Sequence, residues 1–104
     1  MNSKPGFNEK CYQLLMLVPA GKVTTYSEIA GALNTRAWRA VGSAMAKNKN
    51  LFNIPCHRVV RSDGNIGQYA LGANKKAELL MEEGVDVTNG RVQDLEKFIH
   101  RFSG

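Results

Sequence analysis

The chain has 104 residues, of which 43% are hydrophobic and 22% are charged. This composition is typical of a globular domain, and the length predicts a single domain over residues 1–104 with one modest core. The sequence contains no apolar run of about 18 residues and no signal-peptide pattern, which excludes a membrane-spanning helix and favours a cytoplasmic protein, or a nuclear one in a eukaryote. Fourteen Lys and Arg against nine Asp and Glu give a net charge of +5, which favours a polyanionic partner without requiring one.

The cysteines and histidines form no metal-binding pattern. The two cysteines, Cys11 and Cys56, and the two histidines, His57 and His100, include no C-x-x-C or H-x-x-x-H pair, so we expect no metal site. A reducing compartment also disfavours a disulfide between the cysteines. Cys11 lies on an apolar helix face, where we expect it to act as a small core residue.

Apolar spacing predicts two helices before residue 34. The first carries an apolar face from Phe7 to Val18 and ends at Pro19 and Gly21. The second begins at Thr25, where Thr25 as N-cap and Glu28 three residues later fit a capping box.

A third helix is predicted from Arg36 toward Lys47, capped by Asn34–Thr35. Its apolar stripe contains Trp38, Val41 and Met45, while its other side carries small and basic residues: Arg39, Ala40, Ser43 and Lys47. The second and third helices, joined by a tight turn, predict a helix-turn-helix. Any helical hairpin gives a similar pattern, so this signal alone does not establish DNA binding.

The second half of the chain predicts small wings and two more helices. A hairpin is expected from Val59–Val60 through the turn 62–65 to Ile66. A helix capped by Asn74 should run through Glu83 with its inward face formed by Ala77, Leu80 and Met81, and an extended stretch follows around Asn89–Gly90. A last helix from Asp94 should bury Leu95, Phe98, Ile99 and Phe102. The predicted fold is mainly α, a winged helix-turn-helix-like single domain with a small β-hairpin.

The candidate chemistry lies at Pro55-Cys56-His57-Arg58. A cysteine becomes a nucleophile as its thiolate, and a neighbouring base favours that form. Pro55 fixes the backbone before Cys56, and Glu83 on a later helix could hold the His57 ring in the manner of a triad. Two simpler interpretations stay open: a buried cysteine beside a surface histidine, and Glu83 as a solvated acid at a helix end.

The residues around this motif resemble a known family. Asn-Ile-Pro-Cys-His-Arg-Val-Val at 53–60 strongly resembles the signature of the O6-alkylguanine-DNA alkyltransferases, also called methylated-DNA–protein-cysteine methyltransferases. Further blocks follow the family order: 21–26, 39–45, Asn48, the 64–72 loop with Tyr69, and 79–84. The resemblance covers about residues 7–85, and 89–95 fits some members. The chain is identified as a member of this family.

The resemblance implies a DNA repair protein that flips O6-alkylguanine out of duplex DNA and takes the alkyl group irreversibly onto Cys56. It implies that His57 accepts the thiol proton through a bridging water and that Glu83 orients His57. Tyr26 matches a tyrosine that donates to the guanine leaving group, and Asn48 matches a residue that braces the cysteine turn. A single turnover without cofactor, by a monomer, is expected.

The resemblance also implies how the DNA is held. The helix-turn-helix enters the minor groove, and Arg39 inserts into the stack in place of the flipped nucleotide. Small residues allow close approach: Ala40, Gly42, Ser43, Ala44 and Ala46. Positioning contacts to phosphate would come from Arg36, Lys47, Lys49 and Arg61. The alkylguanine pocket would be lined by Tyr26, Pro55, Val59, Tyr69 and Ala70. In the simpler interpretation, Arg39 contacts phosphate, the small residues pack against another helix, and both tyrosines belong to the core.

Two departures from the family leave other functions open. With the resemblance beginning near residue 7, we expect no extra N-terminal domain of the kind that many members carry. The length is then similar to that of alkyltransferase-like proteins, which flag lesions for excision-repair proteins. Those proteins usually carry Trp or Ala in place of the cysteine, whereas Cys56 is present here. The loop reads Tyr69-Ala70-Leu71-Gly72 where many members have a glycine pair, so the alkyl size is not predicted. The alternatives are a non-catalytic lesion sensor, a winged-helix regulator that reads a defined sequence, and a cysteine hydrolase.

Overall fold

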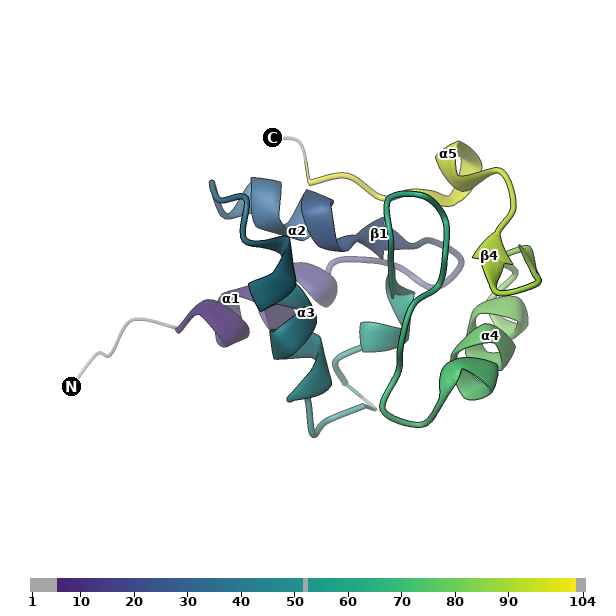
Figure 1. Ribbon diagram of the computed structural model, residues 1–104, viewed down its shortest axis with the longest axis horizontal. Helices are drawn as coiled ribbons and strands as arrows, with labels where there is room; N and C mark the ends of the chain where they lie inside the picture. The colour runs from purple at the N-terminus through teal and green to yellow at the C-terminus, as the bar shows by residue number, and fades with distance from the viewer. Residues whose placement is uncertain (1–5, 52, 103–104) are drawn as a thin grey trace.

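The computed structural model describes residues 6–51 and 53–102 and is mainly helical (Figure 1). In chain order the elements are α1 (Phe7–Leu15), β1 (Thr24–Thr25), α2 (Tyr26–Ala32), α3 (Trp38–Ala46), the short 3₁₀ helix η1 (Cys56–Arg58), β2 (Val59–Val60), α4 (Ala73–Glu82), β3 (Val87–Thr88), β4 (Arg91–Val92) and α5 (Leu95–Phe98). The predicted fold class, a mainly helical helix-turn-helix with a small hairpin, is confirmed. Over the described residues, none of these helices has the length and apolar character needed to cross a bilayer.

Helices α1, α2 and α3 pack around one hydrophobic cluster. Its buried members are Cys11, Leu15, Val18, Ile29, Ala30, Val41, Ala44, Met45, Cys56 and Val59. The hydroxyl of Tyr12 on α1 donates a 2.6 Å hydrogen bond to the carbonyl of Ala44 on α3. The prediction that Cys11 is a core residue is therefore confirmed, and Cys56 belongs to the same cluster.

The helix-turn-helix is capped as its sequence predicts at α2 and differently at α3. Thr25 Oγ1 accepts a 3.0 Å hydrogen bond from the backbone N–H of Glu28, which is the first half of the capping box. After α2, Asn34 adopts a left-handed conformation (φ +59°), and Thr35 Oγ1 accepts from the N–H of Ala37. Helix α3 therefore begins at Trp38, two residues later than expected, with Ala37 as its N-cap residue.

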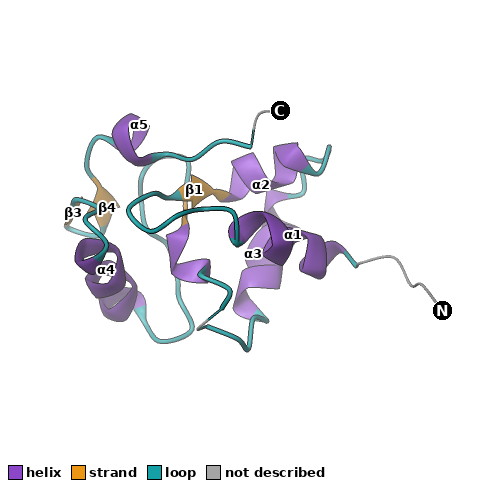
Figure 2. Ribbon diagram, turned by 180° about the vertical axis from the view of Figure 1, so that it is seen from behind, coloured by secondary structure: helices purple, strands orange, loops and turns teal. Residues whose placement is uncertain are grey.

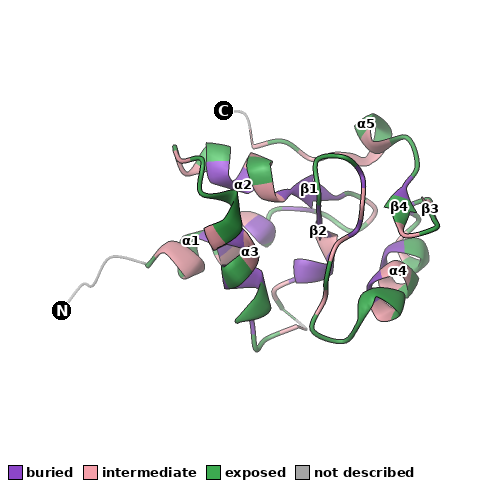
Figure 3. Cartoon of the chain, viewed as in Figure 1, coloured by how far each residue is buried: buried purple, intermediate pink, exposed green. Residues whose placement is uncertain are grey.

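The apolar stripe predicted for α3 is buried only in part. Val41 and Met45 are buried, but Trp38, the remaining residue of the stripe, is 50% exposed. Because α3 starts at this residue, its side chain lies at the end of the helix rather than over the three-helix cluster. Figure 3 shows the start of α3 coloured as exposed.

The central strands pair in a way that the sequence did not predict. β1 and β2 are parallel, with Thr24 opposite Val59 and Thr25 opposite Val60, so the expected hairpin between Val59–Val60 and Ile66 is wrong. Figure 2 shows β1 and, at one side of the molecule, the antiparallel pair β3–β4. That pair turns at Asn89–Gly90 and is the hairpin of this fold. The β1–β2 pairing fixes the start of α2 next to the end of the Cys56 motif.

A second hydrophobic cluster joins α4 to the central strands and the hairpin. Its buried members are Val23, Val60, Ile66, Leu80, Val85 and Val92. Helix α4 begins after Gly72 (φ +97°) rather than at an Asn74 cap, a conformation that favours glycine. Met81, expected inside, is 52% exposed, whereas Lys76 is fully buried.

The last predicted helix is shorter than expected. α5 covers Leu95–Phe98 and follows Asp94 in a left-handed conformation. The chain then runs alongside residue 23, because the N–H of Val23 donates to the carbonyl of Phe98 and the N–H of His100 donates to the carbonyl of Val23. The four apolar side chains expected to be buried here, Leu95, Phe98, Ile99 and Phe102, are half-buried.

Candidate active site

Cys56 is the first residue of η1 and is held by the loop that precedes it. Its backbone N–H donates a 2.8 Å hydrogen bond to the carbonyl of Ile54. The same carbonyl accepts a 3.0 Å hydrogen bond from Asn48 Nδ2, and Asn48 Oδ1 accepts from the N–H of Asn50. Asn48 is buried, so its amide ties the end of α3 to the turn that presents Cys56.

A cleft of about 810 Å³ opens beside Cys56. Its lining comes from α2, α3, η1 and the loop that follows β2: Tyr26, Ser27, Trp38, Arg39, Gly42, Met45, Ala46, Cys56, Arg61, Ser62, Asp63, Gln68, Tyr69 and Ala70. In Figure 1 this loop runs between α3 and α4 and passes in front of β1. Cys56 is only 5% exposed. Its exposed atoms line this cavity, which is large enough for a nucleobase.

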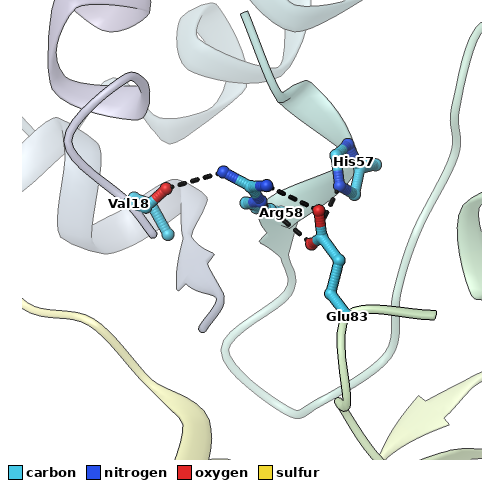
Figure 4. Close-up of polar contacts among 4 residues, drawn as sticks. All are labelled: Val18, His57, Arg58 and Glu83. Atoms are coloured by element: carbon cyan, nitrogen blue, oxygen red, sulfur yellow. Dashed lines mark hydrogen bonds and ion pairs between the residues drawn. The ribbon is translucent and has the colours of Figure 1, made fainter. Parts of the chain in front are cut away.

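His57 is the residue beside the cysteine that can move a proton. Its ring is buried, and Nε2 lies 3.1 Å from Oε1 of Glu83, the C-cap of α4 (Figure 4). Burial lowers the pKa of His57, and the positive charges of Arg58 and Lys76 act in the same direction. Together they outweigh the raising effect of the Glu83 carboxylate on this pKa, so the imidazole is neutral near pH 7. A carboxylate can only accept, so the ring hydrogen lies on Nε2 and Nδ1 keeps a free electron pair.

Arg58 holds the other side of the same carboxylate, a contact that sequence reasoning missed. Its guanidinium donates from Nε to Glu83 Oε1 at 2.9 Å, from a terminal nitrogen to Oε2, and from the other to the carbonyl of Val18 at 2.9 Å (Figure 4). Burial alone would raise the pKa of Glu83, but the hydrogen bonds from Arg58 and the contact with His57 lower it overall. Glu83 is therefore ionised and fixed in place by two neighbours in the motif.

Tyr26, the first residue of α2, lies on the cleft opposite the cysteine motif. Burial raises the pKa of Tyr26, although the positive charge of Arg61 opposes the shift, so its hydroxyl stays a hydrogen-bond donor at neutral pH. The loop closes on it at Gly67, where φ is +75° and a Cβ would lie 3.4 Å from the Tyr26 hydroxyl oxygen. A side chain at Gly67 would strain this close approach.

Two further residues, Tyr69 and Lys76, lie near the Cys56–His57 pair. The Tyr69 ring meets His57 edge-on at a centroid distance of 6.4 Å. Lys76 is fully buried, and its ammonium donates a 3.1 Å hydrogen bond to the carbonyl of Gln68 in the cleft loop. Burial lowers the pKa of Lys76 to about 8, while charge on the nearby Cys56 acts in the opposite direction. The sequence offered one indication that Lys76 is buried, because it precedes the buried Leu80 by four residues and so shares its helix face. A lysine is nevertheless normally expected in solvent.

The remaining predicted site residues fall outside the cleft lining. Pro55 and Val59, expected to line the pocket, are buried, and Val59 belongs to the three-helix cluster. Along α3 and the turn before it, the exposed face carries Arg36, Ser43 and Lys47, and Ala40 is half-buried. Between residues 6–51 and 53–102, no three His, Cys, Asp or Glu side chains are grouped as a metal site.

These features define a helix-turn-helix protein in which a cysteine, supported by a histidine–glutamate pair, faces a cleft beside the second helix of the motif. Residues 6–85 match the family described as "6-O-methylguanine DNA methyltransferase, DNA binding domain". A methylated-DNA–protein-cysteine methyltransferase of Saccharolobus islandicus is 46% identical over 81 residues, which cover 78% of this chain and 52% of that protein. The chain belongs to this methyltransferase family.

Two solved structures share the fold. S. pombe Atl1, in complex with damaged DNA containing O6-carboxymethylguanine, has a TM-score of 0.81 and 31% identity over 91% of this chain and 94% of its own. The O6-methylguanine-DNA methyltransferase of Pyrococcus kodakaraensis strain KOD1 has a TM-score of 0.71 and 48% identity over 78% of this chain and 47% of its own. The matched region spans about half or less of the curated relatives, 52% of the Saccharolobus protein and 29% of a bifunctional methyltransferase/endonuclease of Picrophilus torridus.

Proposed function

We propose that this protein binds duplex DNA, takes an O6-alkylguanine base into the cleft and transfers the alkyl group to Cys56. The observation that carries the proposal is that Cys56 lines the cleft while the next residue, His57, contacts Glu83. A cysteine that serves only the core needs neither an adjoining cavity nor a base held by a carboxylate.

The proposed reaction is a direct displacement at the alkyl carbon. The thiol proton of Cys56 passes through a water molecule to Nδ1 of His57, and the sulfur attacks the alkyl carbon. A sulfur–carbon bond forms as the bond from that carbon to guanine O6 breaks, and the electron pair goes to the guanine. The guanine takes up a proton from water, and His57 returns the thiol proton to water, so the protons balance. Tyr26 donates a hydrogen bond to this leaving group, and Glu83 stabilises the protonated His57.

The product explains why the protein acts once. Cys56 ends as a thioether, and the site offers no group that cleaves a carbon–sulfur bond, so each molecule is consumed by one transfer without a cofactor. Arg58 supports the reaction from behind, because it holds the Glu83 carboxylate that orients His57.

DNA binding in this proposal uses the exposed start of α3. Arg39 is exposed and lines the cleft, so it can fill the space in the duplex that the flipped nucleotide leaves. Three further basic residues are exposed, Arg36, Lys47 and Arg61. They would contact phosphates and make affinity depend on salt. The net charge of +5 supports this electrostatic attraction.

The test is to incubate the protein with a duplex that contains one O6-methylguanine, then measure the intact mass and map the modified peptide. We expect one added methyl group on Cys56 and restored guanine in the DNA. Cys56→Ser should gain no mass, whereas Cys11→Ser should gain one methyl group like the parent, because Cys11 is fully buried and does not line the cleft.

A lesion sensor is the second candidate, and the likeness to S. pombe Atl1 over 94% of that chain favours it. In this case, the protein would bind the lesion duplex more tightly than plain DNA and leave Cys56 unmodified, with excision-repair proteins as its partners. The same mass experiment distinguishes the candidates, because an unmodified protein that still prefers the lesion duplex contradicts transfer and supports sensing.

A further inference from the structure

The exposure of Trp38 is not explained by the fold. It is the single tryptophan of the chain, and half of its surface is exposed at the first residue of α3. Apolar contact with the three-helix cluster is made by Val41 and Met45 on the same helix, both buried. Leaving so large an apolar surface in water has a cost that burial would remove, which points to a contact made by the indole in another state of the protein.

The position of Trp38 indicates the chemistry of that contact. The indole lines the same cleft as Cys56 and Arg61, and the guanidinium carbon of Arg39 lies 5.1 Å from the centre of its ring. Of the charged residues that line this cleft, Arg39 and Arg61 are cationic and Asp63 is anionic, and the Asp63 carboxylate is paired with Arg91 at 3.9 Å. The remaining positive charge favours a polyanion over a basic or neutral surface. A partner that offers both flat π-faces and negative charge is a nucleic acid, since bases stack on aromatic side chains while phosphates pair with arginine.

We propose that Trp38 is a second DNA-contacting side chain of α3, whose indole stacks on a nucleotide beside the flipped lesion after Arg39 leaves the ring for the duplex. This inference rests on the proposed function, because it assumes that Arg39 enters the DNA. In the free protein, the cation–π contact covers one face of the indole with Arg39. When Arg39 moves into the duplex, that face becomes available, and a base or sugar next to the lesion takes its place.

The test measures binding in a Cys56→Ser background, so that transfer does not consume the complex. The affinity for a duplex with one O6-methylguanine is measured by fluorescence anisotropy for the parent, Trp38→Ala, Trp38→Phe and Met81→Ala. Met81 is the matched control because it is a large apolar side chain with 52% exposure that does not line the cleft. Thermal unfolding of each variant verifies that the fold is retained.

We expect Trp38→Ala to weaken lesion binding about tenfold, the loss typical of one removed base–aromatic stack. Trp38→Phe should recover most of the affinity, and Met81→Ala should bind like the parent. Because the chain has one tryptophan, stacking has its own spectroscopic signature: the emission of the parent should be quenched as the lesion duplex saturates it. That readout needs no substitution at Trp38 and is independent of how the alanine variant folds.

The proposal is overturned if Trp38→Ala binds the lesion duplex as tightly as the parent, or if the emission is unchanged at saturation. The failure of alkyl transfer has a different signature, since a protein with Cys56 intact would then bind the lesion and gain no mass. In that case, quenching of the Trp38 emission and the weaker lesion binding of Trp38→Ala would still support the contact between Trp38 and DNA. If the parent binds no lesion duplex, both proposals fall together.

Discussion

Replacing Lys76 by methionine should remove a rise in stability that the protein otherwise shows at alkaline pH. Lys76 is fully buried on α4, with one hydrogen bond from its ammonium to the carbonyl of Gln68. None of the ion pairs among residues 6–51 and 53–102 includes it. Burial lowers its pKa from 10.5 to about 8, so the folded protein releases this proton more readily than the unfolded chain.

The sign and size of the effect follow from this difference. Below about pH 8, Lys76 is charged in both states, and the folded state bears the cost of a buried ammonium. Between the folded value of about 8 and the unfolded value of 10.5, the unfolded chain binds more protons, so the free energy of unfolding rises with pH. At about 1.4 kcal/mol per pKa unit, the full gain is about 3 kcal/mol, and most of it falls between about pH 7 and about pH 10.

Urea unfolding of the parent and of Lys76→Met at these two pH values measures the effect. From the lower to the higher pH, the parent should gain about 2–3 kcal/mol in free energy of unfolding relative to Lys76→Met, which has no ammonium to deprotonate. Ionisation of tyrosines affects both proteins and cancels in the difference. The control is Lys75→Met, which removes the same charge one residue earlier on α4, where the side chain is 43% exposed. If the Lys76→Met difference is independent of pH, the depressed pKa of Lys76 is refuted.

Three other variants test the site. Glu83→Gln should slow transfer at least tenfold and lower the free energy of unfolding by about 1–3 kcal/mol, because Arg58 keeps its charge without its carboxylate; single-turnover kinetics and urea unfolding at pH 7 measure both. The pKa of Glu83 is lowered on folding, so its contribution to the free energy of unfolding is present above the unfolded pKa near 4.5 and is lost as the pH falls further. The difference in free energy of unfolding between the parent and Glu83→Gln should therefore become smaller in acid. Gly67→Ala should lower the melting temperature by several degrees, equivalent to about 1–2 kcal/mol, because φ is +75°, a conformation that strains any residue with a Cβ. An unchanged melting temperature would show that the loop relaxes freely. Arg39→Ala should weaken binding to the lesion duplex in a titration at fixed salt while the fold stays stable, and a variant that unfolds instead contradicts the intercalating role.

The parts of the site that could be predicted are those set by local sequence. Thr25 and Glu28, three residues apart, identify a helix start, and the hydrogen bond from the Glu28 N–H to the Thr25 side chain forms as expected. The contact between His57 and Glu83 was predicted across 26 residues, and their side chains lie 3.1 Å apart. It could be predicted because the motif and the later helix end each have a recognisable pattern and suitable chemistry.

The features that were missed depend on what lies opposite a residue in space. Val59 and Val60 were predicted to pair with the nearest apolar stretch in the chain, but their partner is β1, 35 residues earlier. A two-residue parallel pairing leaves no periodic signal from which to predict it. Met81 was misplaced, and the exposure of Trp38 and the burial of Lys76 were not predicted, for a related reason. Helix spacing fixes which residues share a face, whereas the helix start and the packing partner determine which of them are covered.

The Arg58 guanidinium has a consequence for how the two hydrophobic clusters unfold. Its side chain reaches the carbonyl of Val18, a member of the three-helix cluster, and the carboxylate of Glu83, which follows Leu80 of the second cluster on α4. β2 also runs between the two clusters, because Val59 belongs to the three-helix cluster and Val60 to the second. The Arg58 side chain adds hydrogen bonds to both regions. Thermodynamic cooperativity of the fold and orientation of the histidine therefore depend on the same carboxylate. A variant that loses it should show amide protons exchanging earlier around α4 than around α1 to α3, in place of a single global opening.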